Sequence, residues 1–487
     1  MRSISIFLLA VVIFGVSVFG GFVQDDRLVI LSNPTMGKLG GLFGSLVSPY
    51  FYNRPELGNY RPLTSFSLIW DSLVFGNDAW GFRLINVLLY GFVCVGVYEL
   101  AKRMQKKGDW AFWVAILFTV LPIHSEAVTS IVGRGEILNG GLVILMLILV
   151  KDGKWGWSIL AYLLALLSKE SAIVWVMPWG WMLLREKIKK DYKLGLLVSM
   201  MMLIVGYFVL RWGVLEEFIF SDRATVVQNP LKFISSGQRI MAGIGLVAFG
   251  VSKVLLPINL SYDYSFEQLK LSELTSWWFA LGMGVILFSV WLARKKNESL
   301  KLAIAIFWLP LLVTGNILKP IGTIFGERLW FLPSLGVVMV VVMTISNFMN
   351  RRWLRLPRQL RFIAMTTVGV ILLMFSVRTM MRNMDWLSEE RLFVTDAQYV
   401  TGSVLAQSNA AAMYLKARDF DQAKIYLEKA EAIYPLYPEL MNNWGIYYWW
   451  TGDLEEANRR FEKCLESHPE DGLCTENIEA LKRNKKR

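Results

Sequence analysis

Two adjacent carboxylates, Asp25 and Asp26, directly follow the first long apolar run of the sequence. Ionisable residues at membrane depth are costly unless they are paired or used, so they mark candidate functional sites. One carboxylate can act as a general base on an incoming hydroxyl group. Its neighbour can hold a sugar hydroxyl or a metal ion. The alternative is a hydrated acidic loop that only supports the topology, and the pair alone leaves both interpretations open.

Further polar groups lie between later apolar runs. Arg61 offers a planar guanidinium that suits phosphate, and Arg328 can bind a phosphate or pair with its neighbour Glu327. Lys169 and Glu170 can serve a substrate or neutralise each other in a tight turn. The candidate substrate-binding residues are Tyr60, Arg61, His124, Glu126, Arg134, Glu136, Lys169, Glu170, Asp263, Glu327 and Arg328.

A metal centre is not predicted. His124 and Glu126 are one histidine and one carboxylate, which is a weak signal for a metal. The sequence shows no Walker loop, zinc motif or dinucleotide fingerprint, so a nucleotide-driven pump is disfavoured. A divalent metal is compatible with the candidate site but is not required by it.

The elements that must position these groups are membrane helices. The chain is 55% hydrophobic and only 18% charged, whereas soluble domains carry about 25% charged residues. The net charge of +12 does not indicate nucleic acid, because the basic residues cluster in short loops such as Lys102, Arg103, Lys106 and Lys107. Such loops are typical of the cytoplasmic side of a membrane protein.

The apolar runs predict about eleven membrane-crossing helices of roughly 20 residues each. We interpret the first, 4–22, as an uncleaved signal anchor with a cytoplasmic N-terminus. Full crossing of 239–256 would place the basic clusters at 294–296 and 351–352 outside. A re-entrant or interfacial segment at 239–256 avoids this conflict, and it leaves the C-terminus outside.

Residues 381–487 are expected to form a second, extracytoplasmic domain after the membrane domain at 1–380. Five positions recur at a spacing of 34 residues, which is typical of tetratricopeptide repeats. They pair Ala411 with Gly445, Tyr414 with Tyr448, Ala423 with Ala457, Leu427 with Phe461 and Pro435 with Pro469. The repeats are placed at about 404–437 and 438–471, with flanking helices as caps.

Cys464 and Cys474 can pair in an oxidising compartment, and Cys94 is a packing residue. The predicted fold class is thus all-α.

The ordered motifs resemble the transmembrane-and-tetratricopeptide protein O-mannosyltransferases, within the GT-C glycosyltransferases. They are GFVQDD (21–26), NYRPLT (59–64), LPIHSEAV (121–128), GRGE (133–136), SKES (168–171), LPINLSYDY (256–264), GERLWFLPSLG (326–336) and NMDW (383–386). The resemblance implies a polyprenyl- or dolichyl-phosphate sugar donor, perhaps carrying mannose, and a hydroxyl acceptor, often Ser or Thr. It also implies inversion at the anomeric carbon, with Asp25 as the base and Asp26 as its helper.

The resemblance has one departure: family members from animals carry long repeat arrays, and this chain carries about two repeats. The acceptor can therefore be a protein or an envelope glycan, in a bacterial inner membrane or an endoplasmic reticulum membrane. The main alternative is a non-enzymatic membrane scaffold whose repeats recruit a protein partner. Two other classes of protein are less consistent with the sequence. A transporter is expected to have two related membrane halves, and a polysaccharide ligase would not require the acid pair.

Overall fold

The computed structural model describes residues 1–105, 109–217, 224–352, 357–467 and 472–485, and these residues form helices and loops without a β-strand. Lys106, Lys107 and Pro469 lie outside them. The first helices are α1 (Arg2–Phe14), η1 (Gly15–Phe19), η2 (Arg27–Leu31), α2 (Leu39–Gly44), η3 (Pro55–Leu57), α3 (Pro62–Phe75), α4 (Ala79–Met104), α5 (Trp110–Thr119), η4 (Pro122–His124), α6 (Ser125–Thr129), η5 (Ile131–Gly133), α7 (Arg134–Lys151), α8 (Trp155–Ser168), η6 (Glu170–Trp175) and α9 (Val176–Arg185).

The remaining helices continue the bundle and then form the C-terminal domain. They are α10 (Lys190–Leu215), η7 (Pro230–Phe233), α11 (Ser236–Leu255), α12 (Leu271–Leu274), α13 (Trp277–Ala293), α14 (Glu298–Thr314), η8 (Glu327–Trp330), α15 (Phe331–Arg352), α16 (Arg358–Asp385), α17 (Glu389–Tyr399), α18 (Val404–Lys416), α19 (Phe420–Ile433), α20 (Pro438–Thr451), α21 (Leu454–Ser467) and α22 (Gly472–Lys485).

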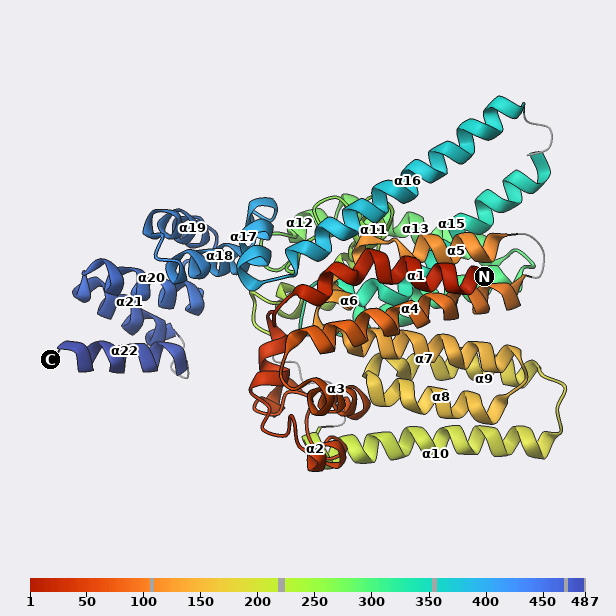
Figure 1. Ribbon diagram of the computed structural model, residues 1–487, viewed down its shortest axis with the longest axis horizontal. Coiled ribbons are helices and arrows are strands. Elements are labelled where there is room, and N and C mark those ends of the chain that lie inside the picture. Colours follow the sequence, from red (N-terminus) through yellow and green to blue (C-terminus); the bar gives the residue numbers. More distant parts are fainter. Residues whose placement is uncertain (106–108, 218–223, 353–356, 468–471, 486–487) are drawn as a thin grey trace.

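The long helices run side by side, and the C-terminal domain lies at one end of them, which we call the repeat-side end (Figure 1). The N-terminus lies at the opposite end. Basic loops meet there: Arg103 Nε lies 2.8 Å from Asp152, and Arg185 lies 3.6 Å from Glu298. The grouping of basic loops at one end is the arrangement that the sequence pattern predicts for a cytoplasmic face.

Eight of the described helices are long and apolar enough to cross a membrane. They are 2–19, 79–104, 131–151, 190–215, 236–255, 271–293, 327–346 and 358–385. The bent pair Trp110–Thr119 and Pro122–Thr129, with a 54° angle, would make nine. The expected count of about eleven is not confirmed, since helices such as α8, with 14 residues, fall short of the roughly 20 needed for a full crossing. The bend at Pro122 follows from the missing N–H of proline and its clash with the preceding turn.

Helix α11 (236–255) is continuous, so its glycines do not break it. They allow close packing instead: a Cβ on Gly250 would overlap the Trp330 indole ring, and one on Gly245 would meet the Leu274 carbonyl. Although α11 is long enough to span, its flanking loops meet, because Phe266 N donates to Val227 O at 3.0 Å. The helix itself is one of those long and apolar enough to cross a membrane, so the expected non-crossing segment at 239–256 stays a prediction.

The C-terminal domain contains two helical hairpins, α18–α19 and α20–α21, with α17 before them and α22 after them (Figure 1). Ala411, Ala423 and Ala457 are fully buried, and a Cβ on Gly445 would overlap the Phe461 ring. These are the small positions of the 34-residue pattern, where two helices approach closely. A disulfide joins Cys464 to Cys474, and Cys94 is free and buried.

A buried ion pair joins the two domains. Arg382 in α16 contacts Asp396 in α17 through two bonds of 2.6 and 3.0 Å, and both side chains are at most 1% exposed. Asp396 also accepts from Tyr262 N at 2.7 Å. The pair fixes α17 to the end of α16, and through Tyr262 to the loop after α11.

We expect Asp396→Ala to lower the free energy of unfolding by about 3–5 kcal/mol, because the buried Arg382 guanidinium loses its two short bonds and keeps only the 3.3 Å contact with Asp385. Thermal unfolding of the detergent-purified protein measures this change. Glu428→Ala is the control, since its 3.9 Å contact with Lys424 is exposed and such pairs contribute little. Equal unfolding midpoints for the two variants would contradict the prediction.

Candidate functional site

The Asp25–Asp26 turn lies at the repeat-side end and is held by the start of the C-terminal domain. Gly21 N donates to Leu387 O at 2.9 Å. Glu389 accepts from Gln24 N at 3.1 Å and lies 3.1 Å from Arg27 Nε. Gln24 has a φ of +53°, a left-handed conformation that a residue with a Cβ adopts only at some cost. The acid pair is therefore fixed by contacts on both of its sides.

Asp26 is fully buried and both of its carboxylate oxygens are engaged. Oδ2 accepts from Val23 N at 3.2 Å. Oδ1 accepts from Val132 N at 3.0 Å and from Ser130 Oγ at 3.3 Å. These bonds connect the turn to the segment that begins α7. The carboxylate is fully buried in this structure, and the expected helper role, in which Asp26 holds a sugar hydroxyl or a metal, stays a prediction.

Burial raises the pKa of Asp26 to about 6, against the opposing charge of Arg83 and the backbone donors. The unfolded value is about 3.9, so the folded state binds this proton more tightly. The stability that protonation contributes is complete below about pH 4 and is lost as the pH rises through about 6.

We therefore expect the unfolding midpoint of the wild type to fall relative to that of Asp26→Asn as the pH is raised from about 4.5 to about 7.5. The variant lacks the titrating group, so only the wild type loses this contribution. Thermal unfolding at a series of pH values measures the difference. A difference that stays constant over this range would show that Asp26 does not titrate there.

Asp25 behaves differently from its neighbour. Its side chain is 40% exposed, and Oδ2 lies 3.7 Å from an Arg328 nitrogen. Arg328 also lies 3.4 Å from Glu126 Oε1, and its backbone N donates to Glu126 Oε2 at 2.9 Å. An accessible carboxylate, a half-buried guanidinium and a buried glutamate thus form one connected group.

Two further ion pairs lie within electrostatic range of Arg328, since Glu136 and Arg61 both influence it. Arg61 binds Glu170 through two bonds of 2.9 and 2.6 Å. Burial alone would raise the pKa of Glu170, but the Arg61 charge lowers it to about 2. Lys169 is buried and pairs with Glu136. Lys169 and Glu170 therefore do not neutralise each other, and Arg328 pairs with Glu126 rather than with Glu327.

Two of the predicted substrate-binding residues are part of the core. His124 is fully buried, with Nδ1 2.9 Å from the Tyr90 hydroxyl and Nε2 2.8 Å from Ser334 Oγ. Tyr60 is also fully buried and donates to Leu46 O at 2.7 Å. In this structure both side chains are enclosed and bonded within the protein, so their contact with a substrate stays a prediction.

Arg134 is another buried structural residue. It is 0% exposed, pairs with Asp71 at 2.5 Å and donates to Asn86 Oδ1 at 2.7 Å. It also donates to the Phe82 carbonyl at 2.8 Å. These bonds join the start of α7 to α3 and α4, and they leave the guanidinium no approach to a phosphate.

Asp263 and Glu327 hold the loop after α11. Asp263 accepts from Ser403 Oγ at 2.5 Å, at the first residue before α18. Glu327 is fully buried and accepts from Ser261 N and the Tyr264 hydroxyl, each at 2.6 Å. These bonds hold the loop after α11 and connect it to the start of α18, and the predicted contact of both residues with a substrate stays a prediction.

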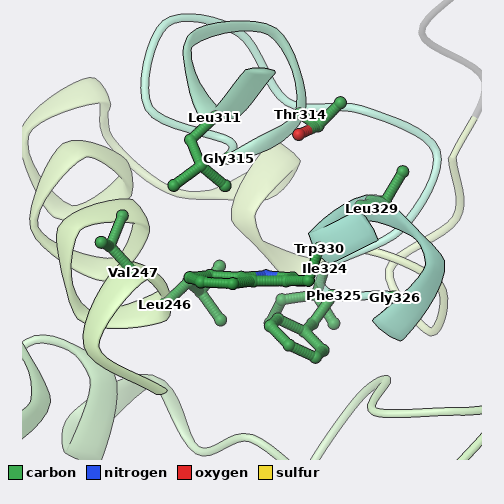
Figure 2. Close-up of a pocket in the computed structure, with 10 residues that line it drawn as sticks. All are labelled: Leu246, Val247, Leu311, Thr314, Gly315, Ile324, Phe325, Gly326, Leu329 and Trp330. Carbon is green, nitrogen blue, oxygen red and sulfur yellow. The ribbon is translucent and has the colours of Figure 1, made fainter. Parts of the chain in front are cut away.

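Two cavities are of interest here. Figure 2 shows a small apolar one beside the Trp330 ring, between α11, the end of α14 and η8. Its volume of about 10 Å³ is at the lower limit for a single water. The other is an open groove of about 630 Å³, lined by residues 18–22 and 77–80. Phe22, the last residue of its first lining segment, lies three positions before Asp25 in the sequence. Among the described residues, no three His, Cys, Asp or Glu side chains are grouped as metal ligands.

Glu389 and Tyr50 belong to this region but were missed by the sequence analysis. Tyr50 is 1% exposed, lies under the Arg61 guanidinium at 5.1 Å, and its hydroxyl has no hydrogen-bond partner among the described residues. No spacing marks either residue, because Glu389 meets the acid turn and Tyr50 meets Arg61 only through the tertiary fold.

No known family model matches the chain. The human protein O-mannosyl-transferase TMTC1 is 25% identical over 91% of this chain and 56% of its own length. The human TMTC3 enzyme is 24% identical over 86% of this chain and 50% of its own length. A protein O-mannosyl-transferase of Caenorhabditis elegans, F38B6.6, is 25% identical over 81% of this chain and 56% of its own length. This chain thus spans about half the length of the curated relatives it matches.

One solved structure, the APC/C hetero-tetramer Cut9–Hcn1, covers 92% of this chain at 11% identity. Its TM-score of 0.22 is too low to place the fold. Over most of its length, the chain is similar to the TMTC protein O-mannosyl-transferases.

Proposed function

We propose that this protein is an inverting membrane glycosyltransferase that moves a sugar, with mannose as the first candidate, from a polyprenyl- or dolichyl-phosphate donor to a hydroxyl acceptor. The single observation that carries the proposal is the accessible Asp25 carboxylate beside the Arg328 guanidinium, in a chain whose relatives are named protein O-mannosyl-transferases. A base for the acceptor and a cation for the departing phosphate are the two groups that this transfer needs.

Asp25 takes the role of general base. Its carboxylate removes the proton of the acceptor hydroxyl as the oxygen attacks the anomeric carbon of the sugar. The bond between that carbon and the phosphate oxygen breaks at the same time, and the electron pair leaves with the phosphate. Attack opposite to the leaving group inverts the configuration at the anomeric carbon.

Arg328 takes the role of phosphate ligand. Its side chain is 34% exposed, against 17% for Arg61 and 8% for Lys169. Arg61 and Lys169 already pair with Glu170 and Glu136. They therefore contribute to the electrostatic potential of the site, and Arg328 is the cation that binds the donor phosphate directly. Contacts between a guanidinium and a phosphate oxygen are charge-assisted and among the strong hydrogen bonds.

The open groove at residues 18–22 and 77–80 is the candidate path for the lipid chain. Phe19 is 86% exposed and Trp80 is 46% exposed along it. Aromatic side chains are favoured at a membrane interface, where the phosphate of a lipid-linked sugar also lies. Phe22, the last residue of the 18–22 lining, precedes Asp25 by three positions in the sequence, and the exposed aromatic side chains support a lipid-linked donor over a soluble sugar nucleotide.

We place the site and the repeats on the extracytoplasmic side, in a bacterial inner membrane or an endoplasmic reticulum membrane. The disulfide between Cys464 and Cys474 favours an oxidising compartment. The acceptor, a protein Ser or Thr or an envelope glycan, then approaches from the side of the repeats.

The test is sugar transfer by the purified protein. A panel of polyprenyl-phosphate sugars is offered with lysate proteins and glycans as acceptors, and the anomeric configuration of the product is determined by NMR. Transfer with inverted configuration supports the proposal. A folded protein that transfers no sugar from any donor would favour the alternative, a scaffold whose repeats recruit a protein partner.

A further inference from the structure

Residues 386–389, which lead into the first helix of the C-terminal domain, contact the 21–27 segment at three points and Arg83 of α4 at a fourth. The Trp386 and Leu387 carbonyls accept from Arg83 and Gly21 at 2.9 Å each. Glu389 accepts from Gln24 N at 3.1 Å and pairs with Arg27 at 3.1 Å. Gln24 and Arg27 are the two residues that flank Asp25 and Asp26, so one carboxylate holds the turn from both sides.

The turn requires such a restraint because of its backbone. Gln24 has a φ of +53°, and non-glycine residues keep this conformation only where their surroundings enforce it. Glu389 supplies an acceptor for the amide of that same residue. Its side chain is 18% exposed, so the contact is partly shielded from water. Without it, the turn can relax to a right-handed conformation, and this would reorient the residue that follows.

We propose that Glu389 is a positioning residue for the transfer reaction: it holds the Gln24–Arg27 turn so that the Asp25 carboxylate faces the reacting groups. This inference rests on the proposed function, because it assigns Glu389 to the general base of that reaction. It also gives the C-terminal domain a part in catalysis that is separate from any binding of the acceptor. A displacement of a base by about 1 Å can cost a hundredfold in rate.

Three variants separate positioning from other roles. Glu389→Ala removes both contacts, whereas Glu389→Gln keeps an oxygen that can accept from Gln24 N and loses only the charge that pairs with Arg27. Glu390→Ala is the matched control, because Glu390 is the exposed next residue of the same first helical turn. Any general effect of an acidic residue on the start of α17 would appear in the control as well.

We expect Glu389→Ala to lower kcat by about ten- to a hundredfold and to change KM for the lipid donor by less than about threefold, since the base rather than the donor site is disturbed. Glu389→Gln should recover most of the lost kcat, and Glu390→Ala should match the wild type. Hydrogen–deuterium exchange of the 21–27 segment should be faster in Glu389→Ala than in the wild type and in Glu389→Gln.

The outcomes are distinguishable. An active wild type together with an unchanged kcat in Glu389→Ala overturns the positioning role and leaves the proposed function intact. The positioning role is also overturned if Glu389→Ala changes only KM, or if Glu390→Ala lowers kcat as much as Glu389→Ala does. If hydrogen–deuterium exchange of the 21–27 segment is the same in Glu389→Ala as in the wild type, Glu389 does not restrain the turn, whether or not sugar is transferred. A wild type without transfer from any donor overturns the proposed function, and with it the catalytic role of Glu389.

Discussion

Asp25→Asn is expected to lower the turnover number for sugar transfer at least about a hundredfold, the usual worth of a positioned general base. The amide has the shape of the carboxylate but cannot accept the proton of the acceptor hydroxyl. Stability should be unchanged, because the Asp25 side chain is 40% exposed and its contact with Arg328 is long, at 3.7 Å. Initial rates with saturating lipid donor, together with an unfolding midpoint, measure both quantities.

The comparison variants for Asp25 come from the same end of the molecule. Glu56→Gln removes a carboxylate from η3, in the same connection between α1 and α3, and should leave turnover unchanged. Asp26→Asn alters a buried, fully bonded carboxylate, so its main effect should be on stability and its pH dependence. A folded Asp25→Asn protein with turnover within about threefold of the wild type would remove Asp25 from the role of base.

The positions of the acid pair and of Lys169 and Glu170 could be predicted from the sequence, because each lies directly at the end of an apolar run. Their partners could not be predicted. Neighbours in sequence point in different directions along a helical turn, so Asp25 is accessible while Asp26 is buried. Lys169 has an extended backbone between α8 and η6. Its side chain pairs with Glu136, whereas Glu170, the first residue of η6, pairs with Arg61.

The predicted substrate contacts of His124, Arg134 and Glu327 show a second limit of the sequence. A polar residue between apolar runs has the same appearance whether it binds a substrate or completes the core. Arg134 is bonded to α3 and α4, and His124 lies between Tyr90 and Ser334. Only the burial and the bonding of each group separate the two cases, and both properties arise from tertiary packing.

Arg328→Met is expected to lower kcat/KM for the lipid donor by about a hundredfold, equivalent to about 3 kcal/mol. The change removes the most exposed cation of the cluster and with it the charge-assisted contact with the donor phosphate. Arg328→Lys should recover only part of the loss, because an ammonium group cannot present two parallel donors. Binding of polyprenyl phosphate without a sugar should weaken in the same order, as measured by a titration.

A competing explanation for any loss in Arg328→Met is that Glu126 becomes buried and unpaired. The backbone N of Arg328 donates to Glu126 Oε2, and Arg328→Met does not remove this donor, so the substitution changes only the side chain. The double variant Glu126→Gln/Arg328→Met removes the unpaired carboxylate. If the loss comes from Glu126, the double variant should recover donor binding. If it comes from the missing phosphate ligand, the double variant should stay about as weak as Arg328→Met, while Arg54→Met, an exposed arginine of the same connection, keeps wild-type binding.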